Sequence, residues 1–138
     1  MWYPDLEFCD FIPAKTARVL AVGWLDSRHS FPTGPVDDLV VAKLRALLET
    51  PWQPGIFLGW HDCEFCPSGV VPATGVRNVF VPKEKCIYAA PEMIVHYIEA
   101  HGYRPPPVFQ EAVLECPKMR SEAYFEALVA AGAREASG

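Results

Sequence analysis

A histidine and two cysteines fall close together in the segment GWHDCEFC, residues 59–66. Imidazole nitrogen and thiolate sulfur are the ligands that zinc prefers in tetrahedral protein sites, and two cysteines separated by two residues have the spacing of a zinc knuckle. If residues 55–61 form a strand, the side chains of His61 and Cys63 point to the same face of the extended chain. The segment therefore predicts that His61, Cys63 and Cys66 supply three ligands of one Zn2+ ion at the end of a strand.

A fourth ligand must come from another part of the chain, and the candidates are His29, His96, His101 and Cys86. His29 follows the apolar run at residues 18–25, which is typical of a central strand. If this strand and the strand before His61 are parallel neighbours, the loops after them leave the same end of the sheet. We therefore expect His29 to complete the site, with His96 or His101 as the alternatives.

His96 and His101 lie five residues apart on a predicted helix, a separation of about 500° of rotation. In a regular helix their side chains then point about 140° apart, so we expect at most one of them to reach the ion. His101 also falls on the apolar stripe, at the end of the helix where the dipole favours an imidazole without any metal. A packed or hydrogen-bonded histidine is the alternative interpretation of both residues.

The two cysteines of a CxxC pair can also form a redox dithiol or remain as buried thiols without metal. In redox proteins the first thiol lies at the start of a helix, but here Pro67 follows Cys66 directly and begins a loop rich in Pro, Ser and Gly. A metal site is therefore favoured, and the other two interpretations stay open. The remaining cysteines are expected to be plain buried thiols, namely Cys9, Cys86 and Cys116.

A catalytic zinc needs an open coordination position and a nearby acid or base, and Asp26, Asp62 and Glu64 are near the candidate ligands in sequence. Asp62 and Glu64 would face away from Cys63 on an extended chain, so we expect both in solvent. The chain lacks HExxH, the zinc deaminase pairing, GxSxG, a P-loop and GxGxxG. No catalytic residue is assigned, and whether the protein is an enzyme stays open.

A structural zinc in an interaction or accessory protein is the leading functional hypothesis. A small metalloenzyme is the first alternative, with water in the fourth position and His96 or His101 as general base. A dithiol redox protein, in which Cys63 and Cys66 cycle to a disulfide, is the second.

Short elements punctuated by fourteen prolines must position these ligands. We expect strands at residues 18–25 and 56–60, and a hairpin of residues 76–82 and 86–89 around Lys83-Glu84-Lys85. We expect helices at residues 36–50, 91–101, 108–114 and from Ser121 to Gly132. This order predicts an α+β fold, a small mixed sheet with helices packed mainly on one face and the zinc knuckle at a strand end.

The composition bounds the class of protein. The 138 residues predict a single domain, 1–138, with a frayed tail at about 133–138. A net charge of −5 gives no basic footprint for nucleic acid, and no apolar run approaches the length of a membrane span. The odd number of unevenly spaced cysteines and the absence of a signal-peptide pattern favour the cytoplasm. The composition allows a protein partner or a homodimer without arguing for either.

Three segments of the chain resemble a family of small uncharacterised bacterial proteins, a domain of unknown function. They are AVGWLDSRHSFPTG (21–34), FLGWHDCEFC (57–66) and YAAPEMIVHYIEAHGYRPPPVF (88–109). The family pattern is approximately GWLxxxHxFxxG, GxHxCxxC and YxAPxxIxHYIxxHxYxPPxxF, and the similarity covers about residues 18–114. The resemblance brings no activity, but it implies that the family pattern contains six of the candidate ligands: His29, His61, Cys63, Cys66, His96 and His101.

Overall fold

A mixed sheet of three strands lies at the centre of the protein in a computed structural model, which describes residues 2–8, 18–53, 61–67 and 74–133. The strand order is β1 (Arg18–Ala21), β5 (Cys86–Pro91) and β4 (Asn78–Lys83). β5 pairs in parallel with β1 and antiparallel with β4. The central position of β5 follows from its sequence, because a strand that is buried almost throughout needs a neighbour on each side.

The antiparallel pair is the hairpin that the sequence predicts. Lys83 pairs with Cys86, so the connection is the two-residue turn Glu84-Lys85. Glu84 adopts a positive φ of 53°, as tight hairpin turns require of a central residue.

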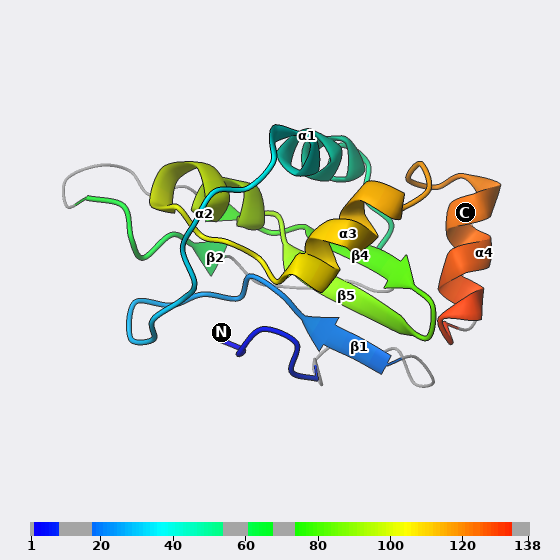
Figure 1. Cartoon of the computed structure of the whole chain (residues 1–138), viewed down its shortest axis with the longest axis horizontal. Coiled ribbons are helices and arrows are strands. Elements are labelled where there is room, and N and C mark those ends of the chain that lie inside the picture. Colours follow the sequence, from blue (N-terminus) through cyan, green and yellow to red (C-terminus); the bar gives the residue numbers. More distant parts are fainter. Residues whose placement is uncertain (1, 9–17, 54–60, 68–73, 134–138) are drawn as a thin grey trace.

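Three helices cover one face of the sheet, and they are α1 (Asp38–Leu47), α2 (Ile94–His101) and α3 (Pro107–Glu115) (Figure 1). The N-terminus of α1 is capped by Asp37, whose side chain accepts a hydrogen bond from the backbone N–H of Leu39. A fourth helix, α4 (Glu122–Ala130), is capped by Ser121 and packs beside β4, where the Tyr124 hydroxyl donates to the carbonyl oxygen of Phe80. The α+β fold with helices mainly on one face is confirmed.

Several elements are shorter than the sequence predicts: α1 covers residues 38–47 of the expected 36–50, and β1 and α2 each lose one end for a local reason. β1 ends at Ala21 rather than at residue 25, because Gly23 has a φ of 80° that an extended strand does not allow. The side chain of Asp5 accepts a hydrogen bond from the N–H of Gly23 at this point. α2 begins at Ile94 rather than at Pro91, because Pro91 still pairs with Asn78 as the last residue of β5.

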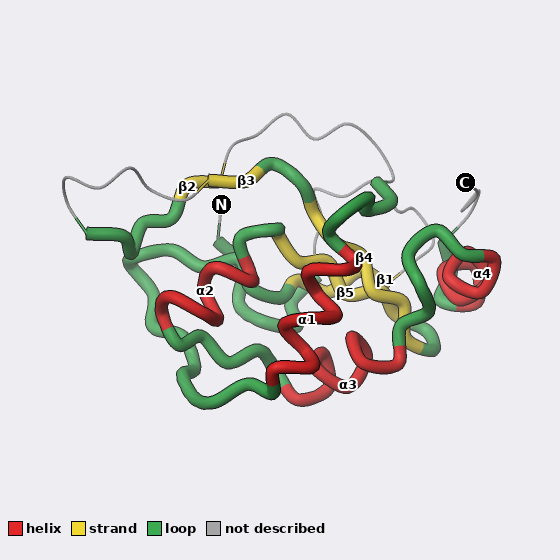
Figure 2. The backbone as a smooth tube through the Cα atoms, turned by 90° about the horizontal axis from the view of Figure 1, so that it is seen from above, coloured by secondary structure: helices red, strands yellow, loops and turns green. Residues whose placement is uncertain are grey.

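A second, two-stranded sheet carries the cysteine segment. β2 (His61–Asp62) pairs antiparallel with β3 (Thr74–Gly75), and Figure 2 shows this pair well away from α4. The predicted strand at residues 56–60, Cys9 and the tail at residues 134–138 lie outside the described residues. None of the helices in the described ranges has the length and apolar character needed to cross a membrane.

Candidate metal centre

Two thiols and two imidazoles converge between the cysteine segment and α2. Their ligand atoms, from Cys63, Cys66, His96 and His101, all lie within 4.8 Å of one another. The Sγ of Cys63 is 3.3 Å from the Nε2 of His101, and the Sγ of Cys66 is 3.4 Å from the Nε2 of His96. A tetrahedral metal with bonds of about 2.3 Å to sulfur and about 2.0 Å to nitrogen requires ligand atoms roughly 3.3–3.8 Å apart. The group therefore has the composition and the spacing of a four-ligand metal site.

The cysteine pair lies on a turn directly after β2. The backbone N–H of Phe65 points at the Sγ of Cys63 at 3.4 Å, a contact that stabilises a thiolate or a metal-bound sulfur. Cys63 is buried at 4% exposure, whereas Cys66 is partly exposed. The short antiparallel pairing of Asp62 with Thr74 holds the start of this turn.

Phe65, between the two cysteines, anchors the turn in the aromatic core. Its ring meets Phe31 edge-on at 5.2 Å between centroids and Tyr97 at 5.9 Å, and it lies 5.6 Å from the ring of His101. Tyr97 is fully buried on the inner face of α2. Hydrophobic packing by these rings thus helps to hold the thiols next to α2.

Both histidines of α2 face the cysteine pair, and their Nε2 atoms are 3.3 Å apart. The expectation that helix rotation would keep one of them away is therefore wrong. The rotation argument treats a side chain as a radial rod, whereas an imidazole turns about two bonds and carries Nε2 well away from its own Cα. His101 is also the last residue of α2, followed by the left-handed Gly102 with a φ of 70°.

Glu92, just before α2, ties the cysteine-bearing sheet to that helix. Its carboxylate accepts hydrogen bonds from the backbone N–H groups of Val76 and Arg77, at 2.5 and 2.9 Å. It also pairs with the Arg77 guanidinium at 3.2 Å. The position of the Glu92 side chain leaves room only for glycine at residue 75, because a Cβ there would lie 2.4 Å from the Glu92 Cγ.

The protonation of two of these ligands is shifted by their surroundings. Burial lowers the pKa of His96, and the neighbouring His101 lowers it further, so the neutral imidazole that binds metals is favoured. Burial also raises the pKa of Cys63, and the adjacent Cys66 thiol adds to this effect. The Cys63 thiol must therefore release its proton when it binds a metal ion.

His29, the expected fourth ligand, is not brought to the two cysteines. Its Nδ1 is 2.7 Å from the carboxylate of Asp26, and its ring stacks on Trp2 at 3.6 Å between centroids. Its loop nevertheless adjoins the cysteine turn, since Glu64 accepts hydrogen bonds from the N–H and the hydroxyl of Ser27. The two loops thus meet, although the parallel partner of β1 is β5 and the His29 ring is directed to Asp26.

The remaining residues singled out in the sequence lie outside the cluster of four ligands where the structure describes them, and Cys86 is only partly buried rather than buried as expected. The His61 side chain lies outside the described part of the structure. Asp62 and Glu64 are exposed, as expected. The thiol of Cys86 donates to the carbonyl oxygen of Lys83 at 3.5 Å, and Cys116 is buried with its pKa raised by burial to about 11.

The sequence reasoning missed the pairing of the two histidines. The resemblance contained one signal for this pairing, because the family pattern includes both His96 and His101 as well as the two cysteines. A helix of only eight residues that ends at a histidine was the second signal, since regular rotation is least reliable at a helix end.

Comparisons with known proteins identify a family, but the description of that family names no activity. A family model described as a domain of unknown function (DUF7919) matches residues 1–114 of the chain. No curated protein and no solved structure gives a match. The geometry of the site must therefore carry the functional conclusion.

Proposed function

The chain belongs to the family of the domain of unknown function DUF7919, and since that family brings no activity with it, we propose from the site alone that this protein binds one Zn2+ ion. The proposed ligands are the Sγ atoms of Cys63 and Cys66 and the Nε2 atoms of His96 and His101. The main support for this proposal is that these four atoms lie within 4.8 Å of one another.

The ligand types favour zinc over other common ions. Two thiolates and two imidazoles form the donor set of structural zinc sites, whereas magnesium and calcium take oxygen ligands. The spacing of the two imidazole nitrogens, 3.3 Å, is close to the edge of a tetrahedron around a metal bonded at about 2.0 Å. Copper and nickel in the divalent state prefer flatter geometries, which this arrangement does not favour.

We infer a mainly structural role for the ion, in an interaction or accessory protein. Four protein ligands complete a tetrahedron and leave no position for a substrate or a reactive water. The ion would fasten the turn after β2 to α2, two segments that are distant in the sequence. Four cysteines in the described ranges are free thiols, which fits the reducing cytoplasm that we propose as the location.

Elemental analysis of the purified protein tests the ligand set. We expect about one zinc per chain in the unchanged protein and a large loss in Cys63→Ser and His96→Ala. His29→Ala is the matched control, since it removes an imidazole that is bound to Asp26 instead. Retention of zinc by His96→Ala together with its loss from His29→Ala would overturn the assignment.

Cobalt substitution tests whether the coordination is closed. A Co2+ ion bound by two thiolates and two imidazoles gives intense visible bands and a sulfur-to-metal band in the near ultraviolet. We expect these bands to stay unchanged when azide is added, because no coordination position is open. A shift of the visible bands with azide would contradict the structural role and favour a catalytic metal.

A further inference from the structure

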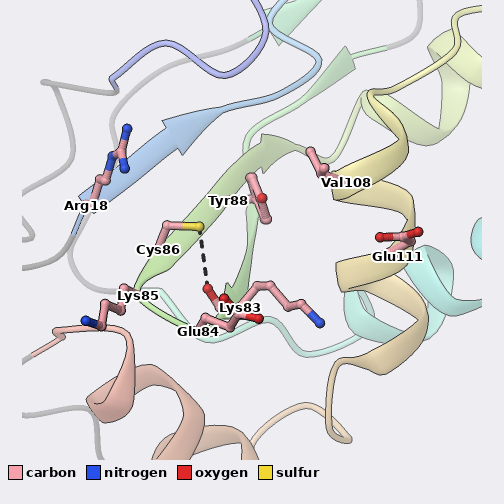
Figure 3. Close-up of a pocket in the computed structure, with 8 residues that line it drawn as sticks. All are labelled: Arg18, Lys83, Glu84, Lys85, Cys86, Tyr88, Val108 and Glu111. Atoms are coloured by element: carbon pink, nitrogen blue, oxygen red, sulfur yellow. Dashed lines mark hydrogen bonds between the residues drawn. The ribbon is translucent and has the colours of Figure 1, made fainter.

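A hollow of about 570 Å³ lies at the far end of the main sheet, beside the β4–β5 turn. Figure 3 shows Cys86 and Tyr88 on β5 at one side of it and Val108 and Glu111 on α3 at the other. Its volume falls within the range of small-molecule sites in proteins. None of the proposed metal ligands lines it.

The strand register explains which side chains enter this hollow. Cys86 and Tyr88 are two residues apart on β5 and therefore point to the same face. Arg18 pairs with Cys86 across the parallel ladder, and Lys83 pairs with it across the hairpin, so both share that face. The thiol of Cys86 is short, and it leaves a gap between the sheet and α3 that a larger side chain would fill.

Three cations line the hollow, namely Arg18, Lys83 and Lys85, and they differ in their partners. Lys83 forms an ion pair with Glu115, and that contact engages its charge. Arg18 has no carboxylate partner in the described part of the chain. Its guanidinium lies over the Phe8 ring, 5.4 Å from the ring centre, on the side of β1 away from β5, so it must turn toward the hollow to meet a ligand (Figure 3). A guanidinium presents a fixed fork of donors that matches the two oxygens of a carboxylate.

We propose that this hollow binds a small organic carboxylate, with its charged group at Arg18 and its apolar body between Tyr88 and Val108. Lys85, exposed at the β4–β5 turn, adds a second positive charge at the rim. Glu84 and Glu111 also line the hollow, and their negative charges repel the carboxylate of the ligand. The ligand therefore binds with its carboxylate toward Arg18 on β1.

The inner wall suits such a ligand. Tyr88 is 7% exposed, and its ring meets Phe109 edge-on at 5.8 Å. Burial and the neighbouring Cys86 raise the pKa of Tyr88 to about 12, so its hydroxyl stays protonated at neutral pH and can donate to an oxygen of the ligand. Val108 is 47% exposed in the free protein and gives the opposite wall an apolar surface.

Binding of benzoate, followed by amide chemical shifts in two-dimensional NMR, tests the proposal. We expect saturable shifts at Cys86, Tyr88 and Val108, with a Kd of about 1 mM for a ligand of this size. Benzamide has the same shape without the charge, and benzylamine has the opposite charge. We expect both to bind at least about tenfold more weakly, because a charged hydrogen bond is stronger than a neutral one.

Two variants locate the binding. Arg18→Met keeps much of the apolar stem and removes the charge, and it should weaken benzoate binding about tenfold. Lys118→Met removes an exposed cation outside the hollow and should leave the Kd unchanged. Val108→Glu places a carboxylate on the apolar wall of an exposed helix position, and it should also weaken binding.

Three results would overturn the proposal. The first is the absence of saturable shifts with benzoate, and the second is equal or tighter binding of benzamide or benzylamine. The third is an Arg18→Met variant with normal amide dispersion and an unchanged Kd. A separate titration with inorganic phosphate tests the role of the apolar body of the ligand. Phosphate that binds as tightly as benzoate would contradict that role.

Discussion

The Nε2 atoms of His96 and His101 lie 3.3 Å apart although five positions separate these residues on one short helix. Each nitrogen is also within 3.4 Å of a different cysteine sulfur. The two rings therefore act as one half of a binding site, and the cysteine turn supplies the other half.

This relationship predicts that neither histidine can replace the other. We expect His101→Ala to lower zinc affinity at least about 100-fold, because changes in residues that merely support metal ligands already cost about 10–100-fold. Competition with a chromophoric chelator measures the affinity. Glu122→Gln is the control, since Glu122 is an exposed carboxylate on α4, well away from α2 (Figure 1). Equal affinities for His101→Ala and the unchanged protein would contradict the ligand set.

Replacement of Gly75 by alanine should destabilise the protein from outside the metal site. The new Cβ would lie 2.4 Å from the Glu92 Cγ, so Glu92 must move away from the N–H groups of Val76 and Arg77. We expect the free energy of unfolding to fall by about 1–3 kcal/mol, the usual effect of leaving such groups without their partners. Urea denaturation measures it, and Val76→Ala is the exposed neighbouring control. A Gly75→Ala variant as stable as Val76→Ala would show that Glu92 adapts without loss.

Metal removal should loosen one part of the protein and leave the main sheet folded. The buried residues of β1, β4 and β5 form the core together with α1, α2 and α3, and Cys63 is the one proposed ligand that belongs to it as a buried residue. Apolar packing of the strands should therefore persist without the ion. We expect a chelator to raise amide hydrogen exchange in residues 61–67 and 94–103, with the amides of β5 still protected. Loss of protection throughout the sheet at the same chelator concentration would mean that the ion holds the whole fold together.

Asp5 predicts a pH dependence of stability that does not involve the metal site. Its carboxylate accepts hydrogen bonds from the Tyr103 hydroxyl at 2.8 Å and from the N–H of Gly23 at 3.0 Å. Burial nevertheless raises its pKa in the folded state above the usual 3.8. The folded protein thus holds this proton to higher pH than the unfolded chain does. The stabilising contribution is full below about 3.8 and is lost as the pH rises through the folded pKa.

Asp5→Asn removes the titrating group and should flatten this part of the pH profile. The difference in unfolding free energy between the two proteins, from urea denaturation at several pH values, isolates the contribution of Asp5 because other pH effects are shared. We expect the unchanged protein to lose stability relative to Asp5→Asn as the pH rises from about 4. A relative gain over the same range would mean that the hydrogen bonds outweigh burial.

Tyr103→Phe tests the same contact from the other side. Tyr103 is fully buried directly after α2, and its hydroxyl joins that helix end to the N-terminal segment. Removal of the hydroxyl should cost about 1–2 kcal/mol of unfolding free energy, because the Asp5 carboxylate loses one of its two donors. Thermal unfolding followed by circular dichroism is the measurement. Phe125→Leu, a change of partly buried ring volume on α4, serves as a comparison for packing loss without a lost hydrogen bond.

Local patterns in the sequence predicted much of the fold. The hairpin around Glu84, the cap at Ser121 and the end of α2 at Gly102 each depend on neighbouring residues, and each is present in the structure. The end of β1 and the start of α2 were less predictable. They depend on contacts between distant segments, such as the hydrogen bond between Asp5 and Gly23.

The site was predictable in its cysteines and not in its histidine partners. The spacing of Cys63 and Cys66 is a local signal, and their sulfurs do lie in the Cys2His2 group. The choice among distant histidines depended on which loops and helices meet. The His29 loop does contact the cysteine turn through Ser27 and Glu64, but β1 pairs in parallel with β5 and not with a strand before the cysteines. The sequence did not reveal that Asp26 binds the His29 ring. Nor did it reveal that the packing of Phe65 against Tyr97 brings α2 to the thiols.

The parallel pairing of β1 with β5 has a consequence for how the chain folds. The parallel ladder cannot form until both Arg18 and Cys86 are present, so the order of events is set by a contact between residues separated by about half of the sequence. During synthesis the cysteine turn emerges before β5, and His96 and His101 emerge just after it. Closure of the sheet and delivery of the last two imidazoles should therefore occur almost together. Until then the nascent chain offers the thiols of Cys63 and Cys66, together with His29 and His61, to any metal that it meets.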